Sequence, residues 1–286
     1  MVSLTSIIGE AKVGNPSALN RAPGIYQSPG SGTPWTPASV GSLRAWYYRD
    51  GKQDGAAGAV TNTEDIATWL DSTGTYNATT VLTDNPTGRL TTGGPVVANF
   101  NGSQAIRTPN MAIPDDVVCT VGFLARVPAV NISARDFDMV LCFADNSASN
   151  TQLGFCLRRV STQLRWGFAA QFGGSFSGWT GDTVLSTSAW SRVIYTLDGS
   201  AMTITVDGIP QTITQTNVGT PTAGQWLSNA TSCNNITIGA RNWLSGTAEN
   251  WTNDIDEIAW FNEVLTGGNF NNFDSYLADL ATDINE

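Results

Sequence analysis

The chain has 286 residues, more than most single domains but within reach of one large all-β sandwich. Its 24 acidic and 14 basic residues give a net charge of −10, which excludes binding of nucleic acid through neutralised phosphates. Histidine is absent, so the usual zinc sites and every histidine-based catalytic triad are excluded as well. No apolar run approaches the roughly 18 residues of a membrane-spanning helix, so we expect no membrane insertion.

Residues 1–33 are predicted to form an extended arm that precedes a single domain of residues 34–286. Pro16, Pro23 and Pro29 interrupt the arm and block any long helix or strand. The start of the chain lacks the basic and apolar regions of a secretory signal peptide, so we expect synthesis in the cytoplasm. Because chain ends are ordered only when they are tied down, we expect this arm to lie against other chains.

From residue 43 onward, strand-like runs alternate with turn-rich stretches. The predicted strands are Leu43–Tyr48, Ile66–Leu70, Val96–Phe100, Ala105–Arg107, Val117–Val127, Asp138–Phe143, Gly154–Arg159, Gln163–Ala170, Trp190–Leu197, Met202–Val206, Ile236–Ala240 and Ile255–Asn262. Asp-Gly pairs at Asp198 and Asp207 predict tight turns. Many short strands with hardly any helix predict an all-β fold, an antiparallel two-sheet β-sandwich of the jelly-roll type.

One helix is predicted at the C-terminal end, after Thr266, which can cap it. Its apolar residues recur at helical spacing and predict a helix laid against the sandwich; they are Phe270, Phe273, Leu277, Leu280 and Ile284.

Two further segments have simple expected roles. The glycine-rich stretch 173–181 lacks the spacing of a phosphate-binding loop and is expected to be a flexible loop. Cysteines in the apolar runs are expected to pack as small hydrophobic residues. A bridge between Cys142 and Cys156 is conceivable if their strands pair, although synthesis in the cytoplasm argues against it.

Several motifs carry a family resemblance over roughly residues 34–280. They are Leu43–Tyr47, Trp69–Gly74, Val97–Gly102, Trp190–Tyr195, Ile204–Gly208, Ile236–Ala240 and Asp254–Ala259. This pattern resembles the concanavalin A-like (laminin-G-like) jelly rolls found in bacteriophage virion proteins and bacterial surface proteins. The resemblance implies the fold, but the fold hosts both lectins and hydrolases, so function has to be argued from sites.

The acidic segment from Asp254 to Glu257 is the candidate for catalysis. Retaining glycosidases of this fold carry alternating carboxylates on one strand, and their mechanism needs two carboxyl groups about 5–5.5 Å apart. Asp254 and Asp256 would share a face, but Ile258 takes the next position and Glu257 points the other way. The acid/base partner is therefore missing, and we expect no catalytic residues and no enzyme.

Aromatic residues in or beside loops are the candidates for stacking on sugar rings: Phe172, Phe176, Trp179, Trp226, Trp243 and Trp251. The alternative is that the core of the sandwich takes them up. No cofactor is required, but loop oxygens would suit calcium at Asp145, Asn146, Asp182, Asn253 and Asp254. The alternative for these residues is ordinary turn chemistry.

These features together predict a non-enzymatic bacteriophage virion protein, a capsid decoration or adhesion module. The arm would anchor it to other virion proteins of the capsid or tail, and the jelly roll would bind surface carbohydrate. We expect it in the virion and as a homo-oligomer. The alternative is a free lectin or glycoside hydrolase that acts on cell-surface glycans.

Overall fold

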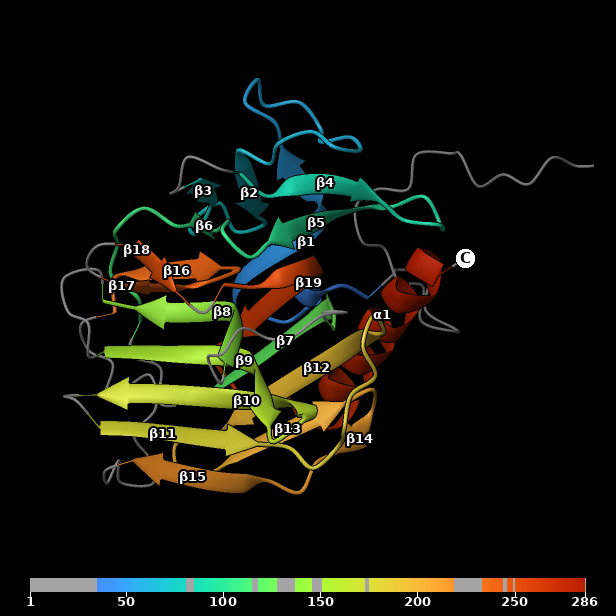
Figure 1. The fold of residues 1–286 in the computed structure, drawn as a ribbon. Coiled ribbons are helices and arrows are strands. Elements are labelled where there is room, and N and C mark those ends of the chain that lie inside the picture. Colours follow the sequence, from blue (N-terminus) through green and yellow to red (C-terminus); the bar gives the residue numbers. More distant parts are fainter. Residues whose placement is uncertain are drawn as a thin grey trace, which may run out of the picture.

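A computed structural model describes most of the chain from Trp35 onward. The described residues are 35–80, 85–114, 118–127, 137–145, 151–172, 175–218, 233–243, 246–248 and 250–285. The predicted arm, residues 1–33, lies outside them. The predicted all-β class is confirmed, since the described strands pair antiparallel in two facing layers, linked through β2 and β3, with one separate hairpin and one C-terminal α-helix (Figure 1). In the described residues, no helix is both long and apolar enough to cross a bilayer.

The first sheet contains strands from both ends of the chain. They are β1 (Leu43–Gln53), β2 (Thr68–Asp71), β4 (Thr87–Leu90), β5 (Val96–Asn101), β7 (Cys119–Arg126), β12 (Trp190–Leu197), β13 (Met202–Val206), β14 (Ile209–Pro210) and β19 (Thr252–Phe261). β19 lies at its centre, paired with β5 and then β1 along one edge and with β7 along the other. From β7 the sheet continues through β12 and β13 to β14.

The second sheet faces the first. Its strands are β3 (Ala78–Thr80), β6 (Ile106–Arg107), β8 (Phe137–Ala144), β9 (Thr151–Val160), β10 (Gln163–Phe172), β11 (Ser175–Thr180), β15 (Thr214–Val218) and β16 (Asn235–Ile238). They lie in the order β3, β6, β16, β8, β9, β10, β11, β15, and β3 joins them to the first sheet by pairing with β2. A separate hairpin is formed by β17 (Arg241–Trp243) and β18 (Gly246–Ala248).

The prediction of a flexible loop at 173–181 was wrong, because β11 occupies most of that stretch. β11 pairs with β10 on one side and with β15 on the other. Its glycine serves close packing, since a Cβ added at Gly178 would lie 2.6 Å from Nη1 of Arg158. The same side chain crosses Gly167 of β10, where an added Cβ would lie 2.8 Å from its Cδ atom.

The main core fills the space between the two sheets, and aromatic rings dominate it. Trp166 stacks on Trp251 with ring centroids 5.8 Å apart, and Phe143 meets Trp260 edge-on at 5.0 Å. All four of these side chains are buried. Such large rings bury most apolar surface per residue, and this accounts for the many tryptophans of the sequence.

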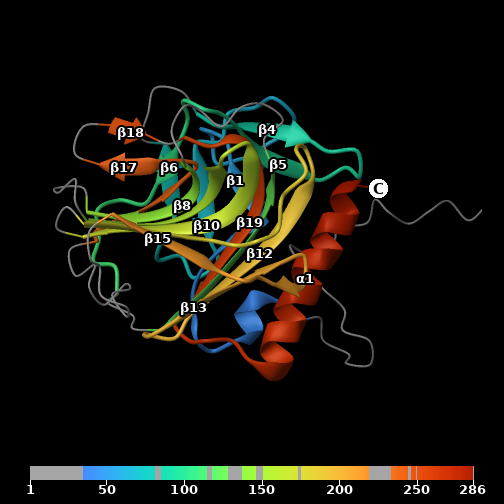
Figure 2. The same cartoon turned by 60° about the horizontal axis from the view of Figure 1, so that its bottom comes forward.

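The C-terminal helix α1 (Gly267–Asn285) covers the outer face of the first sheet (Figure 2). The predicted helical spacing is confirmed, and its buried residues are Phe273, Tyr276, Leu277, Leu280 and Ile284. The ring of Phe273 sits over Gly122 of β7, where an added Cβ would lie 2.4 Å from its Cε1 atom. Trp35, just before the 3₁₀ turn η1 (Pro37–Ser39), packs against Phe273 and Tyr276 with centroids 6.2 and 6.0 Å away.

Two predicted turns are confirmed, and one conceivable bridge is not formed. Asp198 begins the turn between β12 and β13, and Asp207 and Gly208 connect β13 to β14 with φ of 51° and 81°. All four cysteines are free and buried. The register of β8 and β9 places Cys142 opposite Gly154 rather than opposite Cys156, so the two thiols do not meet.

Candidate functional site

A β-bulge in β19 determines where its acidic side chains point. The register against β7 shifts between Ile255 and Glu257. Ile255 and Ile258 lie in the core between the sheets, whereas Asp254, Asp256 and Glu257 all have their partners outside that core. The prediction that Glu257 points away from Asp256 was wrong, because it assumed an unbroken alternation and a bulge inserts one extra residue.

Glu257 ties the helix to the first sheet. Its carboxylate accepts hydrogen bonds from the indole of Trp46 at 2.8 Å, the hydroxyl of Tyr276 at 2.6 Å and the backbone N–H of Arg49 at 3.1 Å. The side chain is buried, and burial together with the neighbouring charge of Asp256 raises the pKa of Glu257 to about 7. Glu257 is therefore a structural carboxyl beneath α1.

Asp256 is equally enclosed. One of its oxygens accepts from Nε and Nη2 of Arg49, at 2.9 and 2.7 Å, and the ammonium of Lys52 lies 3.6 Å from the other. Burial lowers the pKa of Lys52, and the Asp256 carboxylate opposes that shift. Arg49 also donates to the carbonyl of Leu280 in α1 at 3.0 Å. The helix thus covers Asp256 as well as Glu257.

Asp254 differs from the other two because its partners reach the surface. The amide of Asn99 in β5 donates to it at 2.7 Å, Arg89 of β4 forms an ion pair with it, and Nη1 of Arg126 in β7 lies 3.6 Å away. Asp254 itself is fully buried, but the arginine side chains are 35% and 29% exposed. This arrangement places two guanidinium groups at the surface above one buried carboxylate.

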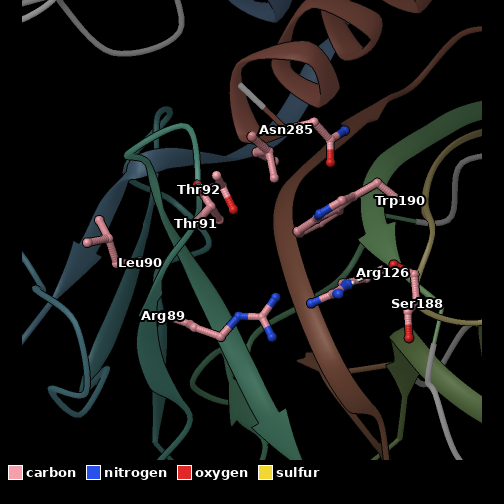
Figure 3. A pocket seen from close by; sticks show the side chains of 9 residues that line it. Arg89, Leu90, Thr91, Thr92, Arg126, Ser188, Trp190 and Asn285 are labelled. Carbon is pink, nitrogen blue, oxygen red and sulfur yellow. Dashed lines mark hydrogen bonds between the residues drawn. The ribbon is translucent and has the colours of Figure 1, made fainter.

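The two guanidinium groups open into a surface cavity of about 330 Å³. Its lining residues are Arg89, Leu90, Thr91, Thr92, Arg126, Ser188, Trp190, Ile284 and Asn285. Figure 3 shows Arg89 and Arg126 pointing toward one another, with the half-buried indole of Trp190 extending into the same space. Nε of Arg126 donates to the carbonyl of Ser188 at 2.8 Å, which fixes that guanidinium in place.

Comparison with known proteins identifies the family. The family model described as the concanavalin A-like lectin/glucanases superfamily matches residues 100–269. The chain belongs to this superfamily. A search of curated proteins finds no match.

Two solved structures similar to this superfamily member are an arabinanase domain and a sialidase. Domain 4 of AbnA, a GH43 extracellular arabinanase from Geobacillus stearothermophilus in complex with arabinotriose, has a TM-score of 0.53 and 16% identity, covering 84% of this chain and 98% of that one. A Trypanosoma rangeli sialidase in complex with the inhibitor DANA has a TM-score of 0.48 and 14% identity, covering 88% and 35%. At these identities the likeness is one of fold.

Of the predicted sugar-binding aromatics, this concanavalin A-like domain has described side chains for Trp179 and Trp251. Trp251 is not available for stacking on sugar, since it is fully buried against Trp166, and for this residue the alternative of uptake by the core holds. Trp179 is half-buried and packs toward the core, with its ring 5.4 Å from that of Phe168. For the others, no side-chain position is described: Phe172 in β10, Phe176 in β11, Trp243 in β17, and Trp226, which lies outside the described residues.

The described candidates for calcium ligands come from three places: Asp145 follows β8, Asp182 follows β11, and Asn253 and Asp254 are neighbours in β19. Asp145 is buried after β8, and Asp182 accepts from the backbone N–H of Thr212 at 3.2 Å, which is turn chemistry. Asn253 donates to the carbonyl of Val127 at 3.0 Å, while one oxygen of Asp254 faces the two arginines and the other accepts from the amide of Asn99. Asn146 lies outside the described residues. Across the described ranges, no three Asp, Glu or Cys side chains are grouped to hold a metal ion.

Sequence reasoning did not nominate Arg89, Arg126 or Trp190. They come from three strands, and no spacing along the chain connects them. The sequence feature that could have pointed to the two arginines is Asp254. A carboxylate buried at the centre of a sheet needs cationic partners.

Proposed function

We propose that the chain is a non-enzymatic carbohydrate-binding module of a bacteriophage particle. The observation that carries the binding role is the surface cavity, where Trp190 offers a ring face beside the donors of Arg89 and Arg126. Its volume of about 330 Å³ lies at the small end of the range for ligand pockets and suits a single sugar unit.

The burial of the acidic segment supports a role without catalysis. A glycosidase needs one carboxyl group as acid and a second as nucleophile or base, both in reach of the scissile bond. Here Asp254, Asp256 and Glu257 are at most 1% exposed, and each is engaged by the scaffold. Substrate would have to displace α1 to reach two of them.

The arabinanase domain supports the sugar ligand. That domain was solved in complex with arabinotriose. The structural match covers 98% of that domain and 84% of this chain. Aromatic rings with a polar edge suit sugars because the apolar face of a sugar ring stacks on them while its hydroxyls bond to neighbouring donors. Trp190 beside the guanidinium donors of Arg89 and Arg126 provides such surroundings.

A glycan array probed with the full chain tests the binding role. We expect recognition of a defined set of glycans, and loss of that signal in Trp190→Ala. Trp179→Ala is the matched control, because it removes another half-buried indole that does not line the cavity.

Binding that survives Trp190→Ala would remove the cavity from the proposal. Glycan hydrolysis that depends on Asp254 or Asp256 would favour the hydrolase alternative instead.

The particle role rests on the predicted arm and on the sequence resemblance to virion proteins. Deleting residues 1–33 should leave a folded domain, with unchanged circular dichroism and glycan binding, that no longer joins phage particles. A truncated protein that still copurifies with particles would contradict the anchoring role.

A further inference from the structure

The cavity carries a local charge opposite to that of the whole chain. Arg89 and Arg126 contribute two positive charges and Asp254 one negative charge, while the chain carries −10 overall. Burial lowers the pKa of Arg89, and repulsion from Arg126 lowers it further. The two guanidinium groups therefore repel one another, and within the part of the chain that the structure describes, their carboxylate partner is Asp254, which compensates one of them.

Each of the two arginines has a guanidinium N–H group beside the cavity that is not hydrogen-bonded within the described residues. Arg89 reaches Asp254 through Nη2, and Arg126 uses Nε on the carbonyl of Ser188 and Nη1 toward Asp254. Among the described residues, Nη1 of Arg89 and Nη2 of Arg126 have no hydrogen-bond partner. An acceptor with one negative charge would satisfy both donors and bring the cluster to neutrality.

We infer that this cavity binds the carboxylate of an acidic sugar, such as a uronic or sialic acid unit. The inference rests on the proposed carbohydrate-binding function and names its ligand class. The carboxylate bridges Arg89 and Arg126, and the sugar ring lies against Trp190. Thr91 donates its hydroxyl to the carbonyl of Pro95 and Asn285 its amide N–H to that of Ala281, so their oxygens accept from the remaining sugar hydroxyls beside Thr92.

Two alternatives fit the residues less well. A neutral sugar would bury part of two guanidinium groups without compensating the extra positive charge, and this costs free energy. A small inorganic anion would satisfy the arginines but would leave the face of Trp190 unused. A sugar ring that carries a carboxylate contacts both the two arginines and the face of Trp190.

Titration of the full chain with N-acetylneuraminate, glucuronate and glucose tests the inference, with the indole N–H signal of Trp190 as the readout. Trp190→Phe assigns that signal. We expect saturable shifts with the two acidic sugars and much smaller ones with glucose.

Arg126→Gln should weaken acidic-sugar binding by about tenfold, because one charge-assisted contact is lost. Arg192→Gln is the matched control, since it removes one similarly exposed arginine that pairs with Asp274 on the helix side of the first sheet. Arg126→Lys keeps a positive charge beside Asp254 and therefore controls for misfolding caused by an unpaired carboxylate. It should still bind the acidic sugar more weakly than wild type does, because an ammonium lacks the planar donors of a guanidinium.

Each contrary outcome has its own meaning. Equal binding of glucose and glucuronate, or full affinity in folded Arg126→Gln, would overturn the acidic-sugar inference and leave the proposed function standing. Equal shifts with inorganic sulfate would overturn it in favour of a plain anion site. If no glycan of any kind bound to the wild-type chain, the proposed function itself would fail.

Discussion

Among individual residues, Glu257 couples the fold to pH. Its pKa is 4.5 in an ordinary setting and about 7 in the folded chain, so the folded state favours its protonated form. The resulting stabilisation is complete below about pH 4.5 and is lost as the pH rises through 7. Over that window, the free energy of unfolding of wild type should fall by about 3 kcal/mol relative to that of Glu257→Gln.

Urea unfolding of the two proteins at a series of pH values measures this difference. Glu64→Gln, which removes an exposed carboxylate, is the control and should follow the wild-type curve. Parallel pH profiles for wild type and Glu257→Gln would contradict the assignment.

The second residue-scale prediction concerns Trp251, whose ring stacks on Trp166 in the core. Trp251→Ala should lower the free energy of unfolding by about 3–5 kcal/mol, because it leaves a large cavity. Trp251→Phe should cost less and should keep wild-type glycan binding, which a microarray can check. Specific loss of binding in folded Trp251→Phe would return this residue to the candidate site.

Sequence reasoning at this scale succeeded where alternation was regular and failed at the bulge. Phe123 and Ala125 lie two residues apart in the predicted strand Val117–Val127, and both point into the core, as regular alternation requires. The side on which Glu257 lies could not be predicted, because nothing in the local sequence marks the extra residue at Asp256. Only the pairing with β7 reveals it.

Between elements, the packing of α1 on the first sheet depends on a missing side chain. Gly122 leaves room for the ring of Phe273. Gly122→Ala should therefore lower the free energy of unfolding by about 1–3 kcal/mol through overpacking. Gly55→Ala is the control, since an added Cβ there would meet nothing within 4 Å.

A double-mutant cycle with Phe273→Leu makes this test specific. The smaller leucine leaves space for the new methyl group, so the double variant should lose less stability than the two single changes together. Strict additivity would mean that the two residues do not contact one another.

Long apolar elements could be predicted from the sequence, and short polar ones could not. The helix was predicted from its spacing, and β12 was found with its exact bounds. β11 and β15 were missed because glycine, serine, threonine and asparagine fill them, which is also typical of loops. β11 pairs with β10 on one side and with β15 on the other, and β15 pairs with β11. The strand conformation therefore depends on pairing with other segments rather than on the local sequence.

For the molecule as a whole, the buried free thiols predict indifference to redox conditions. A reducing agent should leave the melting temperature unchanged, because Cys119, Cys142, Cys156 and Cys233 form no bridge. In the native protein, iodoacetamide should modify them slowly, whereas unfolding should expose all four, as intact mass spectrometry would show. A melting transition that shifts on reduction would contradict the free thiols.

At this scale the class of fold followed from the sequence pattern, but the cavity did not. Arg89, Arg126 and Trp190 converge only because β19 enters the sheet between β5 and β7. That insertion depends on pairing between distant parts of the chain, which no local motif records.

The central place of β19 also has a consequence for the timing of synthesis. Trp46 of β1 pairs with Ala259 of β19, a strand that is made more than 200 residues later. Until then the inner strands of the first sheet have open edges, and closing so long a loop slows folding. We therefore expect the nascent chain to stay incompletely folded until β19 has left the ribosome, and to need protection from association with its neighbours during that interval.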